Sequence, residues 1–92
     1  MTSQRNMVIL SAVLRGWTLA QVAGIFNITR ERVKQIAIRT IKNLYPEIYK
    51  TVVANHVTGS ITEARKHKNR MIPLIQFLTG DPNDIHHLFN NV

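Results

Sequence analysis

The sequence predicts an all-α fold, and three observations support this. Apolar residues recur at intervals of three and four through most of the 92 residues, which is the spacing of a buried helix face. Residues that favour helix ends, such as Ser, Thr, Asn, Gly and Pro, stand between these segments. No segment alternates polar and apolar residues as a half-buried strand does. We therefore expect about six helices and no sheet.

The first expected helix covers residues 6–15, with Ser3 as the first plausible N-cap before it. Gly16 ends this helix, because glycine suits a left-handed cap. Trp17 stands just before the next helix, where it can pack on Val22 and fix the entry angle; we favour this structural role over base stacking. The apolar face of the first helix consists of Met7, Ile9, Leu10, Val13 and Leu14.

The next two helices are expected to form a helix-turn-helix. Thr18 caps the first of them, Asn27 takes the left-handed conformation of the turn, and Thr29 caps the second, which runs to Leu44. The inward stripes are Leu19, Val22, Ala23 and Phe26, then Val33, Ile36, Ala37, Thr40 and Leu44. The opposite side of the longer helix carries Arg30, Glu31, Lys34, Gln35, Ile38 and Lys42. Such a polar face can enter a major groove.

At these residues the chain resembles region four of bacterial RNA polymerase sigma factors, the part that reads the promoter −35 element. The similarity is carried by TRERVKQI after TLAQVAGIFNI, and it covers residues 18–44 without a gap. The chain departs from the family at Ala37, where sigma factors carry an acidic residue, and at Ile38, where they carry a small one. Both departures make the helix more apolar, so we expect its flank to be covered by another part of the protein or by a partner.

The resemblance implies that Arg30, Glu31 and Gln35 contact base edges, and that Arg32 and Lys34 lie near phosphates. The chemistry of these side chains agrees, since Arg pairs with guanine, Gln with adenine and Glu with cytosine. Position on the outward face adds Ile38 to the base contacts. It adds Thr29, Arg39 and Lys42 to the phosphate contacts.

The remaining residues, 45–92, are expected to form a helical extension of the helix-turn-helix core at 5–44, within a single domain. Tyr45-Pro46 should break the recognition helix and start another, running to about Val57. Ser60 to Glu63 has the spacing of a capping box. The basic residues between 65 and 70 are either a second phosphate-contacting surface or a solvated face. Pro73 should kink or restart this helix, and Asp81-Pro82 should begin a last short one.

A homodimer is also expected. Residues 71–78 hold six large apolar side chains, more than a three-helix motif can bury, and Ala37 and Ile38 add apolar surface. A twofold dimer would place two recognition helices one turn of DNA apart. The alternative is that all six residues enter one monomeric core.

Composition limits the function. The net charge of +7 is concentrated in residues 1–44, which contain seven Lys or Arg and a single acidic residue, Glu31. A DNA-binding surface requires such an excess of positive charge. The chain has no cysteine, its histidines lack the spacing of a helical zinc site, and no nucleophile constellation or phosphate-binding glycine loop appears. We therefore expect neither an enzyme nor a metal or cofactor site. The apolar runs are too short or interrupted for a membrane span or a secretory signal.

The leading interpretation is a sequence-specific DNA-binding transcription regulator in the cytoplasm of a bacterium or a phage-infected host. Its expected partner is double-stranded DNA, and RNA polymerase is a further candidate. A complete sigma factor is not expected, because 92 residues leave no space for the region that opens the −10 element. Two alternatives remain: a protein that mimics region four to bind RNA polymerase or a sigma factor, and a DNA-packaging or partition component.

Overall fold

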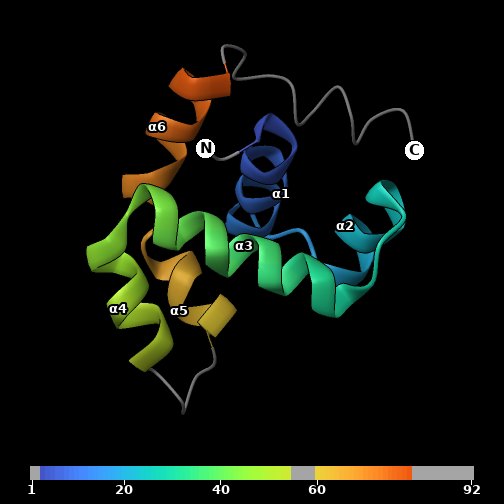
Figure 1. Cartoon of the computed structure of the whole chain (residues 1–92), viewed down its shortest axis with the longest axis horizontal. Coiled ribbons are helices and arrows are strands. Elements are labelled where there is room, and N and C mark those ends of the chain that lie inside the picture. Colours follow the sequence, from blue (N-terminus) through green and yellow to red (C-terminus); the bar gives the residue numbers. More distant parts are fainter. Residues whose placement is uncertain (1–2, 55–59, 80–92) are drawn as a thin grey trace.

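The computed structural model describes residues 3–54 and 60–79, and these residues are helical almost throughout (Figure 1). The all-α prediction is confirmed, and none of the described segments is a strand. The helix expected at residues 81–89 and the end of the helix expected to reach Val57 lie outside the described residues. The helices are α1 (Gln4–Leu14), α2 (Leu19–Phe26), α3 (Arg30–Leu44), α4 (Pro46–Ala54), α5 (Ser60–Lys66) and α6 (Lys68–Thr79).

Helix α1 lies at the centre of the fold and is buried on all sides from Met7 to its end at Leu14. Ser3 caps it by accepting a hydrogen bond from the Asn6 backbone N–H at 3.1 Å, so the helix begins at Gln4, two residues earlier than predicted. Every residue from Met7 to Leu14 is buried, including Ser11. The sequence predicted a single apolar face for this helix. A helix that is apolar all round belongs inside a core, and here other helices pack against it from both sides.

Two apolar clusters meet at α1. The first, which we call the reading-head cluster, joins α1 to α2 and α3; it contains Val8, Ile9, Ala12, Val13, Val22, Ala23, Val33 and Ile36. The second, the extension cluster, joins α1 and α3 to α4, α5 and α6; it contains Met7, Leu10, Leu14, Ala37, Ile41, Ile48, Val52, Ala64, Met71 and Ile75. The helices after Tyr45 therefore complete the burial of α1.

The extension cluster explains why Ala37 is apolar. Ala37 is fully buried against residues of the extension, so this flank of α3 is covered by the same chain. A charged side chain at this position would lose its hydration without gaining a partner. The apolar residue therefore matches the extension, and it gives no support to a dimer.

The sequence predicted a kink or restart at Pro73, but the break between α5 and α6 falls at His67. Hydrogen bonds to the carbonyl three residues earlier mark the break. The His67 N–H donates to the Ala64 carbonyl and the Arg70 N–H to the His67 carbonyl, each at 3.0 Å. Pro73 stands inside α6. Proline leaves the carbonyl four residues earlier, that of Asn69, without its helical donor, but both residues are exposed and water can replace it.

Arg65 belongs neither to a solvated face nor to a phosphate-contacting surface, the two alternatives that the sequence left open. Its Nε donates to the Val13 carbonyl and its Nη2 to the Trp17 carbonyl, both at 2.9 Å. The side chain thus joins α5 to the turn between α1 and α2. This turn contains Gly16, whose φ of 105° confirms the predicted left-handed cap.

Candidate nucleic-acid interface

The start of α2 is fixed by reciprocal hydrogen bonds. The Thr18 hydroxyl accepts from the Gln21 N–H at 3.0 Å, and the Gln21 side-chain oxygen accepts from the Thr18 N–H at 2.9 Å. This capping box strengthens the predicted cap at Thr18. Trp17 is half-buried against the reading-head cluster, which contains Val22, in agreement with the predicted staple.

The turn between α2 and α3 has the predicted left-handed residue. Asn27 adopts φ 56° and ψ 47°, and its N–H donates to the Ala23 carbonyl. The next N–H, that of Ile28, donates to the same carbonyl at 3.0 Å, and the Ile28 side chain packs against the reading-head cluster. The turn therefore sets the angle between the two helices with both backbone and side-chain contacts.

The orientation of α3 about its own axis is set by its cap and its buried stripe. The Thr29 hydroxyl accepts from the Arg32 N–H at 3.0 Å, so the helix begins as predicted. Thr40 donates its hydroxyl to the Ile36 carbonyl at 2.7 Å and needs no outside partner. The buried residues are Val33, Ile36, Ala37, Thr40 and Ile41. Ile41 was missing from the predicted stripe.

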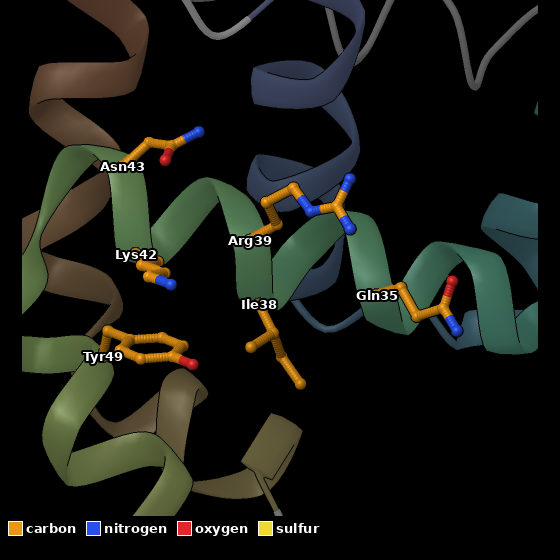
Figure 2. Close-up of a pocket in the computed structure, with 6 residues that line it drawn as sticks. All are labelled: Gln35, Ile38, Arg39, Lys42, Asn43 and Tyr49. Atoms are coloured by element: carbon orange, nitrogen blue, oxygen red, sulfur yellow. The ribbon is translucent and has the colours of Figure 1, made fainter.

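The nine predicted DNA-contacting residues all keep solvent access, but the structure divides them into two groups. The residues at the start of α3 stand exposed: Thr29, Arg30, Glu31 and Arg32, with Lys34 half-buried. Further along the helix a groove of about 540 Å³ opens between α3 and α4. Its lining residues are Gln35, Ile38, Arg39, Lys42, Asn43 and Tyr49 (Figure 2). The groove brings together four predicted residues and leaves Arg30 and Glu31 outside.

Positive charge dominates this surface. Within the described parts of the chain, the ion pairs all lie on α4, α5 and α6 and at the α5–α6 junction: Glu63 with Lys66 and His67, and Arg70 with Glu47. None of the five cations on α3 takes part in these ion pairs, so their charge can neutralise phosphate charge. They are Arg30, Arg32, Lys34, Arg39 and Lys42.

Two lining residues of the groove were missed by sequence reasoning. Asn43 lies four residues after Arg39 and could have been placed on the same face by helical spacing. Tyr49 lies in the next helix, and its ring lies beneath Lys42, with the Nζ atom 5.5 Å from the ring centroid. No sequence signal shows this contact, because it depends on how α4 crosses α3 after Pro46.

No set of three metal-binding side chains gathers among residues 3–54 and 60–79. Of the histidines considered, His67 is described, while His56, His86 and His87 lie outside the described residues. No described helix has both the length and the apolar character needed to cross a bilayer.

Residues 2–45 match the family described as sigma-70, region 4. The match confirms the resemblance and extends it toward the N-terminus, so that it includes all of α1 and ends where α4 begins. No curated protein and no solved structure is significantly similar to the chain. The matched segment contains the helix-turn-helix formed by α2 and α3, and α4, α5 and α6 lie outside it.

Proposed function

We propose that this protein is a sequence-specific DNA-binding transcription regulator that places α3 in the major groove. The observation that carries the proposal is the exposed polar start of α3, on a helix whose opposite side is buried and whose cap is formed. The first turns of a recognition helix reach furthest into the groove, so the residues there read the bases. The region-four match of residues 2–45 supports the same role.

Each proposed base contact has a chemical preference. Arg30 is suited to the two acceptors of guanine, Gln35 to adenine, and Glu31 to the amino group of cytosine. Ile38 has no polar atom and is suited to a thymine methyl group. The proposed phosphate contacts are Thr29, Arg32, Lys34, Arg39 and Lys42. These set affinity and register, whereas the base contacts set preference.

Selection of bound sequences from a random double-stranded DNA pool tests the proposal directly. We expect one enriched motif, bound with an affinity that falls steeply as salt rises, because bound phosphates release counterions. An unenriched pool would reject sequence-specific binding. Failure to bind any DNA at low salt would instead favour the alternative of a protein that mimics region four to contact RNA polymerase or a sigma factor.

We further propose that the protein forms a homodimer through α6. Phe77 is 79% exposed and Leu78 is 46% exposed, whereas Met71 and Ile75 on the same helix are buried in the extension cluster. Burying a phenylalanine side chain stabilises an interface by roughly 1.5–3 kcal/mol. Sedimentation equilibrium should give a dimer mass at micromolar concentration and a monomer mass for Phe77→Asp with unchanged helicity. A monomer mass for the wild type would reject the dimer.

A further inference from the structure

We propose that the groove between α3 and α4 binds one backbone phosphate of the DNA, with the Tyr49 hydroxyl and the Lys42 ammonium group as its ligands. The inference depends on the proposed DNA-binding function. It adds a contact from α4, which lies outside the segment that matches region four. Tyr49 would then be a positioning residue, since it contacts the backbone and not a base.

The contact between Lys42 and Tyr49 prepares the two groups for a shared ligand. The Nζ atom of Lys42 lies 5.5 Å from the centre of the Tyr49 ring, within the range of a cation–π interaction. Tyr49 itself is half-buried against the extension cluster, so its ring has a fixed support. Figure 2 shows the ring beneath Lys42 with its hydroxyl pointing along α3 toward the side where Ile38 lies. The ammonium group and the hydroxyl therefore both face the groove.

The charge of the groove favours an anion. Arg39 and Lys42 are among its six lining residues, and none of the six is acidic. The acid in the first turn of α4, Glu47, pairs with Arg70 at 3.6 Å, with which it forms a contact between α4 and α6. Charge-assisted hydrogen bonds to phosphate oxygens are about twice as strong as neutral ones, and both cations and the hydroxyl can donate them.

A phosphate fits this site better than a base does. Lys42 lies over one face of the Tyr49 ring, and the ring is half-buried, so the ring offers little open surface for stacking. The hydroxyl remains as a donor at the ring edge. A phosphate held there would stand next to Gln35 and Ile38, which line the same groove. Phosphate contacts of this kind fix the register of a recognition helix against the bases.

Two tyrosine variants provide a matched test, because each removes only one hydroxyl. Tyr49→Phe keeps the ring beneath Lys42 and should weaken binding to the selected DNA by about five- to tenfold, the loss expected for one such hydrogen bond. Tyr45→Phe should leave DNA affinity unchanged, since the Tyr45 hydroxyl donates to the Arg70 carbonyl at 3.1 Å. Thermal unfolding of both variants should show that the fold persists.

Salt dependence separates the two proposed ligands. Tyr49 is neutral, so Tyr49→Phe should weaken binding by the same factor at every salt concentration. Lys42→Gln removes a charge and should lower the slope of log affinity against log salt by about one. An equal change of slope in both variants would contradict the assignment.

Replacing single phosphates of the selected DNA with neutral methylphosphonates locates the contact. A methylphosphonate at one position should weaken DNA binding by the wild type and should not weaken DNA binding by Tyr49→Phe any further. Wild-type DNA binding with no loss in Tyr49→Phe would overturn this inference and leave the proposed function intact. A wild type that binds no DNA would reject both. Loss in Tyr49→Phe with no matching phosphate would assign the groove to another ligand and also overturn the inference.

Discussion

Arg65 donates a hydrogen bond from Nη2 to the backbone carbonyl of Trp17, 2.9 Å away, and a second from Nε to the carbonyl of Val13. Carbonyls in the last turn of a helix and just beyond it lack helical donors. Arg65 satisfies the Trp17 carbonyl and adds a second donor to the Val13 carbonyl, which also accepts from the Gly16 N–H at 3.1 Å. A residue of the extension thereby fixes the turn that leads into the DNA-binding helices.

Replacing Arg65 should therefore destabilise the fold. Arg65→Ala should lower the free energy of unfolding by about 1–3 kcal/mol, because the partly buried Trp17 carbonyl loses its donor and the Val13 carbonyl keeps only the Gly16 N–H. Arg65→Lys should recover only part of this loss, since an ammonium group lacks the planar fork. Urea unfolding measures both. The control is Lys68→Ala at the exposed start of α6, and an equal loss in this control would contradict the role of Arg65.

Gln35→Ala and Lys42→Ala should affect DNA binding in different ways. Gln35→Ala should cost roughly 1–3 kcal/mol at the selected site and relax one base position. Lys42→Ala should weaken all sequences alike, because a phosphate contact carries no base preference. Repeating the selection with each variant distinguishes them. Unchanged selectivity in Gln35→Ala would show that α3 does not read the bases as proposed.

Asn27 should tolerate glycine and reject valine. Its φ of 56° lies in the left-handed region, where glycine has no steric penalty and a β-branched residue has a large one. We expect Asn27→Gly to change stability little and Asn27→Val to destabilise by at least about 1–2 kcal/mol. Thermal unfolding gives the comparison. Equal melting temperatures for Asn27→Val and the wild type would contradict the effect of the turn on stability.

Alanine should have opposite effects at two glycines. Gly24 lies within α2, and a Cβ atom there would meet nothing within 4 Å, so Gly24→Ala should stabilise by about 0.5–1 kcal/mol through helix propensity. Gly16 is equally open, but its φ is 105°. Gly16→Ala should therefore destabilise through backbone strain alone. Denaturant midpoints that move in the same direction would contradict this prediction.

Glu63 should make stability fall in acid. Burial alone would raise the pKa of its carboxyl, but hydrogen bonds and charge attraction from Lys66 and His67 outweigh burial and lower the pKa below the ordinary 4.5. A lowered folded-state pKa contributes stability above the unfolded-state value, and this contribution is lost as pH falls through the folded-state pKa. Urea midpoints measured from pH 7 downward should thus decrease below about pH 4.5.

Glu63→Gln tests the assignment of this acid sensitivity. The variant should be less stable at pH 7 and should show a smaller decrease in acid, since its side chain does not titrate. Glu31→Gln provides the control, because Glu31 is exposed and takes part in none of the ion pairs between described residues. A wild-type acid dependence that persists in full in Glu63→Gln would assign the effect to other groups.

The local features of the fold could be predicted from the sequence, whereas its long-range packing could not. The caps at Thr18 and Thr29 and the turn at Asn27 depend on the chemistry of a few neighbouring residues, and all three were predicted correctly. The burial of α1 on every side was not predicted, because it needs contacts from α6, far along the chain. The break at His67 was missed because Pro73 is tolerated inside α6, where the Asn69 carbonyl that lacks a helical donor is exposed to water.

The candidate site shows the same division. The outward face of α3 follows from helical spacing, so the sequence alone assigns Gln35, Ile38, Arg39 and Lys42 to one surface, and all four line the groove. Tyr49 could not be added, because its place beneath Lys42 depends on the crossing of two helices. Whether the nine predicted residues contact DNA as assigned stays a prediction.

The double-sided burial of α1 has a consequence for the order of events during synthesis. Met7, Leu10 and Leu14 leave the ribosome early, but their partners Met71 and Ile75 are made about sixty residues later. Until then, the extension-facing side of α1 lacks its partners from α6, and before α5 is made the turn that precedes α2 lacks its hydrogen bond from Arg65. We therefore infer that a nascent chain has only half of its core while α2 and α3 are already complete. The proposed DNA-binding surface would have its full structural support only after α6 has been synthesised.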